Sequence, residues 1–328
     1  MADIASQAHV RAAEPFALGT SKLCVYLWDE AWQHAPQVLE GDGEALHDMR
    51  VALRRLRSTL ENCAALHGSA QSPAQSPDHG SAHIEFLRKD IAREMRAERK
   101  SLSKIGDALG AVRDFDVLAK YLQDYIEAEL ELAEGAPEHA GLQRFARYLY
   151  ARRDEHFAPM QKAIERAQRP RRKREEFSRW AHSLAGVREP PAELSQAARQ
   201  ILALRVDQAV EMGAVLRSSD EDQQHNLRKS LRRLRYTLEA FAPAFAKPKP
   251  LIKALTALQD VLGEMQDRSV LRAMLLLCFE VHSIDKLPPG AHEFARFGEH
   301  KRDELLQSAR SSWDQLASQG FWDALRAA

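Results

Sequence analysis

Three blocks of this sequence occur twice, in the same order, which restricts the fold to one built by internal duplication. His47–Glu61 (HDMRVALRRLRSTLE) matches His225–Glu239 (HNLRKSLRRLRYTLE) at 10 of 15 positions. The other two pairs are Lys100–Leu118 with Lys253–Leu271, and Phe145–Glu155 with Phe294–Glu304. Order-preserving repeats of this length predict two structurally related units.

Helical periodicity runs through both copies. Apolar residues recur at spacings of three and four, and no sustained alternation of apolar and polar residues indicates a strand. Hydrophobic residues make up 45% and charged residues 29% of the 328 residues, which is typical of a globular helical protein rather than a disordered one. We therefore expect an all-α fold of two internally related helical bundles with approximate two-fold pseudo-symmetry.

Two interruptions organise the chain. The segment 186–191 ends in two adjacent prolines, which a continuous helix does not accommodate. We place the boundary there, with a first helical bundle at residues 1–187 and a second at residues 188–328. Residues from about 68 to 81 are rich in Ser and Pro and predict a mobile surface loop in the first bundle.

Cysteine content and charge indicate the compartment. The three cysteines have no CxxC spacing, so we expect reduced, buried thiols. The longest apolar run, residues 273–279, is far too short to span a bilayer, and the N-terminus does not have the pattern of a secretory leader. These features predict a cytoplasmic protein without a membrane partner. Because 47 basic residues balance 47 acidic ones, any polyanion site must come from local segregation of charge.

The first repeated block has the pattern of a helix with an apolar seam and a basic stripe beside it. In the first copy the seam comprises Leu46, Met49, Leu53, Leu56 and Leu60. The stripe comprises His47, Arg50, Arg54 and Arg57 in the first copy, and His225, Arg228, Arg232 and Arg235 in the second. Each stripe therefore borders a packed interface.

Like charges in these stripes have few partners on their own helix. Arg50 stands four residues before Arg54, a spacing at which like charges cost roughly 0.2–0.5 kcal/mol per pair. One interpretation is a solvated face whose partner carboxylates lie on neighbouring helices. The other is an anion site, because guanidinium groups make paired, charge-assisted bonds to phosphate and a row of them suits a linear polyanion. We favour the second, because both copies keep the charges.

The two histidines of the stripes have two interpretations of comparable weight. His47 and His225 occupy equivalent positions and would donate to a bound phosphate, which favours the charged imidazolium. A core or capping role is the alternative for each.

The second repeated block adds charges that differ between the copies. A further basic stripe leads into its first copy and comprises Lys89, Arg93, Arg96 and Lys100. Only Lys253 remains of it in the second copy, so we expect the first half to hold an anion more strongly. Asp114 and Asp267 follow a Leu-Gly pair in both copies, and we interpret them as helix starts or as partners of a neighbouring Arg rather than as metal ligands.

No catalytic signature accompanies these stripes. The sequence has no Gly-rich phosphate loop, no HExxH and no GxSxG. We therefore nominate no catalytic residue, no metal ligand and no cofactor.

The HxxRxxLRRLRxTLE blocks, each followed by an LGxxxDxxVL block (LGAVRDFDVL and LGEMQDRSVL), resemble the CHAD family, the conserved histidine α-helical domain. The resemblance covers residues 16–325 or nearly so. It implies one domain of two pseudo-symmetric helical bundles with a basic cleft between or along them, which binds inorganic polyphosphate without catalysis. To the stripe residues named above it adds, as candidates for binding, Arg55, Arg233, Lys100 and Lys253.

The leading hypothesis is therefore a non-enzymatic protein that binds inorganic polyphosphate, associates with polyphosphate granules and meets granule proteins there. One alternative is a helical protein that binds nucleic acid. We disfavour it because Tyr236 is the only aromatic residue within either Arg-rich block, whereas single-strand binding normally uses several aromatic platforms. The other alternative is a metal-dependent phosphohydrolase.

Overall fold

The computed structural model describes residues 4–68, 79–129, 137–167, 173–179, 193–218 and 220–328. All regular structure in these ranges is helical, and the only β contact among them is an isolated bridge between Pro15 and Glu193. The expected all-α fold class is confirmed. Within these ranges no helix is both long and apolar enough to cross a membrane.

The helices repeat in order along the chain. The first half contains α1 (Ile4–Gln7), α2 (Phe16–Gln33), α3 (Ala35–Leu39), α4 (Gly43–Gly68), α5 (His79–Glu129) and α6 (Pro137–Ala167). The second half contains α8 (Leu194–Glu211), η1 (Gly213–Arg217), α9 (Glu221–Ala240), η2 (Ala242–Ala244), α10 (Pro248–Phe279), η3 (Ile284–Lys286), α11 (Ala291–Ser318) and α12 (Phe321–Ala327). The three repeated blocks fall on α4 and α9, on α5 and α10, and on α6 and α11.

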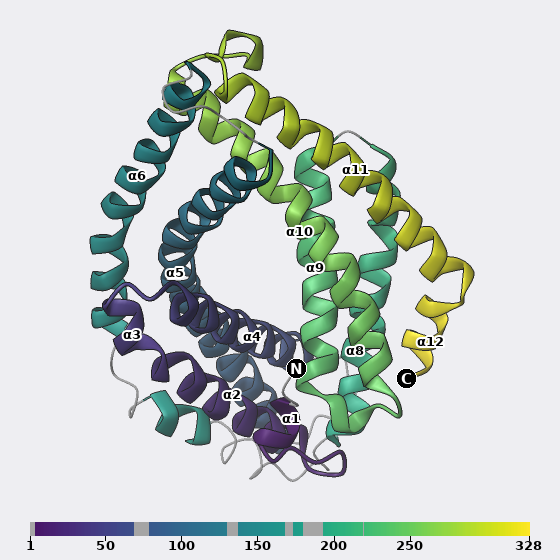
Figure 1. The fold of residues 1–328 in the computed structure, drawn as a ribbon. Coiled ribbons are helices and arrows are strands. Elements are labelled where there is room, and N and C mark those ends of the chain that lie inside the picture. Colours follow the sequence, from purple (N-terminus) through teal and green to yellow (C-terminus); the bar gives the residue numbers. More distant parts are fainter. Residues whose placement is uncertain (1–3, 69–78, 130–136, 168–172, 180–192, 219) are drawn as a thin grey trace.

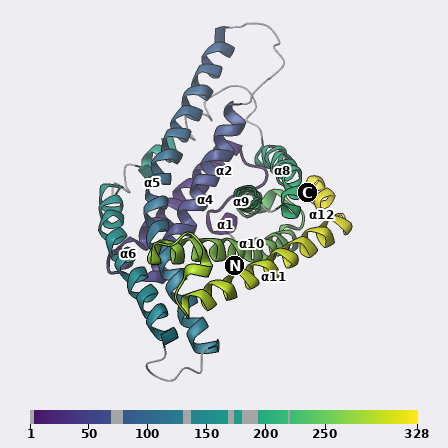
Figure 2. The ribbon, with the colours of Figure 1, turned by 90° about the horizontal axis from the view of Figure 1, so that it is seen from above.

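Figures 1 and 2 show how these equivalent helices are arranged relative to one another. In Figure 1, α4 and α9 lie next to each other, with α5 and α6 on one side and α10 and α11 on the other. Seen from above, α4 and α5 run side by side (Figure 2). The approximate two-fold relation between the halves stays a prediction.

Local chemistry explains where the two Arg-rich helices begin. Before α4, Gly41 has a φ of +95°, and the Asp42 carboxylate accepts hydrogen bonds from the backbone N–H groups of Glu44 and Ala45 at 2.8 and 3.1 Å. Before α9, the Asp220 carboxylate accepts from the backbone N–H of Gln223 at 3.0 Å. Both helices therefore start at an acidic N-cap, which satisfies N–H groups that have no partner inside the helix.

Two predicted boundaries fall partly or wholly outside the described residues. Residues 69–78 of the predicted loop at about 68–81 are not described, whereas α4 reaches Gly68 and α5 begins at His79. The predicted boundary between residues 187 and 188 lies within the segment 180–192, which is also outside the described residues. The division into bundles at 1–187 and 188–328 stays a prediction.

The apolar seams are buried as predicted, in a core that the halves share. Leu53 of α4 and Leu231 of α9 are fully buried in the same hydrophobic cluster, together with Trp28 of α2. A second cluster joins Phe145 of α6 to Phe294 of α11. Because each cluster takes residues from both halves, neither half buries its apolar surface alone. The three cysteines are buried and unbonded, as expected.

A buried polar contact, which we call the joint, links the two Arg-rich helices. Asn62 of α4 is fully buried and its Nδ2 donates to Thr237 Oγ1 of α9 at 3.0 Å. The Oδ1 of Asn62 accepts from Nε and Nη2 of Arg205, on α8, at 3.2 and 2.9 Å. A buried polar group is stable only when it is hydrogen-bonded, so this joint fixes the register of α4 against both helices.

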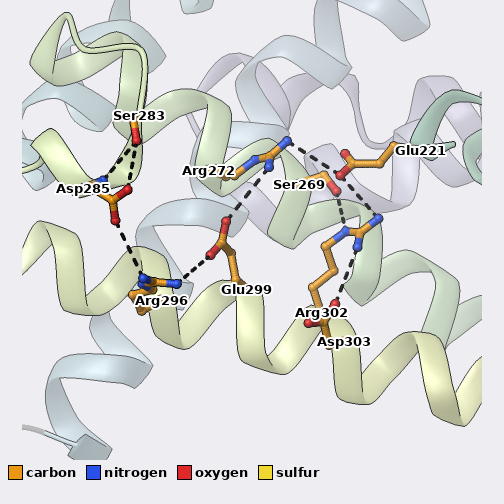
Figure 3. Close-up of polar contacts among 9 residues, drawn as sticks. All are labelled: Glu221, Ser269, Arg272, Ser283, Asp285, Arg296, Glu299, Arg302 and Asp303. Atoms are coloured by element: carbon orange, nitrogen blue, oxygen red, sulfur yellow. Dashed lines mark hydrogen bonds and ion pairs between the residues drawn. The ribbon is translucent and has the colours of Figure 1, made fainter. Parts of the chain in front are cut away.

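Arginines of the third repeated block pack α6 and α11 onto their neighbours. Arg153 Nε donates to Asp116 Oδ1 on α5 at 2.6 Å, and the equivalent Arg302 Nε donates to Ser269 Oγ on α10 at 3.1 Å. In the second half this contact extends into a chain of ion pairs, in which Arg302 Nη2 lies 3.3 Å from Glu221 Oε1 (Figure 3). Arg153 therefore links α6 to α5, and Arg302 links α11 to α10 and α9.

We expect replacement of Asn62 by Ala to lower the free energy of unfolding by about 1–3 kcal/mol, because it removes the buried amide that joins Arg205 to Thr237. Urea denaturation followed by circular dichroism measures this loss. Gln143→Ala, at an exposed position of α6, is the control and should change stability little. Equal stabilities for the two variants would contradict the structural role of the joint.

Candidate functional site

A cleft of about 470 Å³ lies where α4, α5, α9 and α10 meet. We call it the central cleft. Its lining comes from both halves and comprises Arg50, Leu53, Arg54, Arg57, Gly106, Asp107, Asp114, Val117, Leu118, His225, Arg228, Lys229, Arg232, Gln266, Asp267 and Val270. The structure therefore brings together five of the stripe arginines and one of the two stripe histidines.

The central cleft carries an excess of positive charge in a protein of zero net charge. Its lining contains six Arg and Lys side chains against three carboxylates, and no aromatic residue. Charge is therefore segregated locally, as the balanced composition requires of any polyanion site.

Glycines on the facing helices make room for these arginines. A Cβ atom at Gly110 of α5 would lie 3.1 Å from Arg50 Nη2, and a Cβ atom at the equivalent Gly263 of α10 would lie 3.1 Å from Arg228 Nη2. Both distances are tighter than ordinary contacts, so a larger residue would push the guanidinium away. The glycine of the LGxxxD block is thus explained by the close approach of an arginine to the helix backbone.

The aspartates of the same block stand one turn after these glycines. They lie inside α5 and α10, so the interpretation as helix starts is wrong, and the alternative of a partner for Arg is correct for Asp114. Its Oδ1 lies 3.4 Å from Arg50 Nη1. Burial raises the pKa of the Asp267 carboxyl to about 6, although the charge of Arg228 opposes this shift.

Burial and mutual repulsion disfavour the charge of the cleft arginines. Burial lowers the pKa of Arg50 to about 10, and the positive charge of Arg54 adds to the shift. Burial, and then the positive charge of Arg54, likewise lower the pKa of Arg232 to about 9. Burial also lowers the pKa of Arg57 and of Arg228. A bound anion would relieve this repulsion.

The two histidines differ in position. His225 lines the central cleft, and its buried Nδ1 has no hydrogen-bond partner among the described residues. His47 is exposed and lies outside the lining. Burial lowers the pKa of both, helped by the charge of Arg113 at His47 and of Lys229 at His225.

Arg57 and Arg235 are equivalent in sequence but not in environment. Arg57 faces Gly106, where a Cβ atom would lie 3.1 Å from its Nη1. The position equivalent to Gly106 in the second half is Gln259, which is buried and donates to the carbonyl oxygen of Leu231 at 2.9 Å. Arg235 does not line the cleft.

The partners of Arg235 lie on α9 and α10, outside the lining of the central cleft. Its Nη1 donates to Thr256 Oγ1 at 3.2 Å, its Nε lies 3.5 Å from Glu239 Oε1, and its guanidinium packs on the Tyr236 ring.

Arg55 and Arg233 form reciprocal ion pairs across the α4–α9 contact. Arg55 Nε lies 3.1 Å from Glu239 Oε2, and Arg233 Nε lies 3.5 Å from Glu61 Oε1. These arginines occupy equivalent positions, as do the two glutamates. The structure therefore places Arg55 and Arg233 in the junction between the halves and outside the central cleft.

The remaining predicted basic residues also lie outside the central cleft. Exposed positions on α5 hold Lys89, Arg93, Arg96 and Lys100. Within this stripe, Arg93 pairs with Asp90 and Arg96 Nη2 donates to the Ala64 carbonyl at 3.4 Å. Lys253 lines a separate, mostly apolar pocket beside Pro248.

Sequence reasoning missed Lys229 and Asp107, which both line the central cleft. Lys229 was overlooked because its equivalent in the first half is Val51, so the duplication did not mark it. Its place four residues after His225, on the same helical face, is the signal that could have found it. Among the described residues, no group of three or more His, Cys, Asp or Glu side chains is arranged to hold a metal ion.

Solved structures share this fold. The crystal structure of the CHAD domain from the plant Ricinus communis aligns with a TM-score of 0.59 and 22% identity, over 97% of this chain and 92% of that one. PptA from Streptomyces chartreusis aligns with a TM-score of 0.59 and 17% identity, over 93% and 100% of the respective chains. A comparison with curated proteins gave no match.

The model of the CHAD domain family matches residues 26–77 and 82–276. These segments contain both Arg-rich blocks and both LGxxxD blocks, which together line the central cleft. The match covers well over half of the chain, and the chain therefore belongs to the CHAD domain family.

Proposed function

We propose that this protein binds inorganic polyphosphate in the central cleft without carrying out a reaction on it. The observation that carries the proposal is the convergence of Arg50, Arg54 and Arg57 of one half with Arg228 and Arg232 of the other on a single cleft. Burial and like charge lower the pKa of four of these five side chains, and a bound anion would relieve the repulsion among them. A chain of phosphates supplies charge to several guanidinium groups at once.

A linear ligand suits this arrangement better than a single ion. The guanidinium groups come from two helices and are spread over a cleft of about 470 Å³ rather than gathered around one point. The exposed stripe from Lys89 to Lys100 continues along α5, the helix that also contributes Gly106 and Asp114 to the cleft. A chain that leaves the cleft beside α5 would meet this stripe, which gives the first half the larger share of the contacts.

Nucleic acid is the first alternative ligand. The lining of the central cleft contains no Phe, Tyr or Trp on which bases could stack, whereas proteins that bind single strands normally use such platforms. Competition between polyphosphate and single-stranded RNA separates the two ligands, and a clear preference for RNA would favour the alternative.

Phosphate-ester or phosphoanhydride hydrolysis is the second alternative. Release of phosphate from polyphosphate or triphosphate in the presence of divalent metal would support it. We propose instead that the ligand leaves unchanged.

In the cell, binding of polyphosphate would bring a cytoplasmic protein to polyphosphate granules and to the proteins on them.

Replacing Arg54 and Arg232 together by Gln should weaken binding of long-chain polyphosphate at least about a hundredfold, because each charge-assisted contact contributes about 1.5–3 kcal/mol. Isothermal titration calorimetry at constant ionic strength measures the change. The matched control replaces Arg296 of α11 and Arg326 of α12 by Gln, because these exposed arginines lie outside the cleft. The control variant and the cleft variant each lose two positive charges.

The salt dependence of the wild-type protein is the accompanying readout. Affinity should fall by about 0.7 log units per log unit of salt for each phosphate neutralised. Equal losses in the two double variants would show that overall charge, rather than the central cleft, determines binding. Absence of wild-type binding at low salt would overturn the proposed function.

Affinity for polyphosphate should rise as the pH falls from about 7.5 to about 5. Protonation of Asp267, whose pKa is raised to about 6, removes a negative charge from the cleft. His225 acts in the same direction, because burial and then the neighbouring cations lower its pKa, and a bound polyanion would raise it. Titrations at a series of pH values test this, and Asp267→Asn should flatten the part of the profile near pH 6. An affinity that is constant or falls over this interval would contradict the assignment.

A further inference from the structure

Two cleft arginines, one in each half, have an aspartate of the LGxxxD block as the carboxylate that most favours their charge. Arg50 lies against Gly110 and its Nη1 is 3.4 Å from Asp114 Oδ1. Arg228 lies against the equivalent Gly263, and Asp267 is the charged group that most favours its cationic form. Each half thus contributes one Arg and one Asp to the lining of the central cleft, and in each half the Arg lies against a glycine of the facing helix.

The other cleft arginines have no ion pair with a described carboxylate, although the charge of Asp107 favours the cationic form of Arg57. Among the described residues, no carboxylate oxygen lies within 4.0 Å of a nitrogen of Arg54, Arg57 or Arg232. Arg54 is nevertheless close enough to Arg232 to contribute to lowering its pKa. The cleft arginines therefore differ: the charges of Arg50 and Arg228 are favoured by an aspartate of the LGxxxD block, whereas Arg54 and Arg232 have no described carboxylate within 4.0 Å.

Competition with an aspartate affects different polyanions unequally. A phosphate that reaches Arg50 or Arg228 exchanges one negative partner for another and is repelled by the displaced carboxylate. In polyphosphate a single bridging oxygen joins consecutive phosphates, so a second charge arrives immediately beside the first. In RNA a ribose separates consecutive phosphates, so fewer charges reach the same length of cleft. Polyphosphate, which brings more charge per length of cleft, therefore loses a smaller share of its binding free energy when it displaces the carboxylates than RNA does.

We propose that Asp114 and Asp267 are specificity-determining residues, which make the central cleft select polyphosphate over less densely charged polyanions such as single-stranded RNA. This inference rests on the proposed function and adds to it the reason for carboxylates in an anion site. The position of the carboxylates supports the inference, because they occupy equivalent places in the two halves, Asp114 in an ion pair with Arg50 and Asp267 in electrostatic interaction with the equivalent Arg228. Burial raises the pKa of Asp267, so its charge is already costly before neighbouring phosphates add repulsion.

The test compares the wild type with the Asp114→Asn/Asp267→Asn double variant, which preserves side-chain shape and removes both charges. The probes are sodium polyphosphate and an oligouridylate with the same number of phosphates, titrated separately by calorimetry. We expect the affinity for oligouridylate to rise about tenfold or more and that for polyphosphate to rise less than about threefold, because removing a like charge helps the poorer competitor more. The salt slope for oligouridylate should steepen by about 0.7 for each additional phosphate neutralised.

The matched control is Asp124→Asn, which removes an exposed carboxylate of α5 that pairs with Lys120 outside the cleft. It should leave both affinities unchanged. The inference is overturned if the double variant changes both affinities by the same factor. It is also overturned if polyphosphate affinity falls, since the aspartates would then only hold the arginines in place. A wild-type protein that fails to bind polyphosphate overturns the proposed function itself, which is a separate outcome.

Discussion

The packing of α4 against α9 is the contact on which the rest of the structure depends. Each helix buries its apolar seam in the same hydrophobic cluster, and each carries a basic stripe one position away from that seam. Asn62 bridges α4 to Thr237 of α9 and to Arg205 of α8, and the reciprocal ion pairs of Arg55 and Arg233 close the junction. Burying both seams together therefore turns the two stripes toward one cleft.

Gathering like charges in this way costs free energy, and the facing helices α5 and α10 offset part of it. Gly110 and Gly263 let guanidinium groups lie close to the helix backbone, and Asp114 and Asp267 supply negative charge one turn later. The offset is incomplete, because burial and neighbouring cations still lower the pKa of Arg50 and Arg232. A polyanion bound in the cleft would remove this excess of positive charge.

The duplicated helices have not kept identical roles. Gly106 leaves space for Arg57 at the cleft, whereas Gln259 fills the equivalent space in the second half and Arg235 contacts Thr256 instead. Lys229 adds to the second half a charge that the first half does not have. The cleft is therefore unequal at the level of single side chains, although the order of the helices is the same in both halves.

The sequence by itself determined the helices, the family and the direction of each side chain around its own helix. A period of 3.6 residues is a local property, so it was enough to predict the buried seam through Leu53 and Leu231 and the stripes beside it. It did not determine which helix faces each arginine, because that depends on packing between segments far apart in the chain. Arg55 pairs with Glu239 across 184 positions, and Arg235, which the pattern placed in a stripe, contacts Thr256 instead of lining the cleft. Only the tertiary structure separated the arginines that line the cleft from those that join the halves, and only it placed Asp114 beside Arg50.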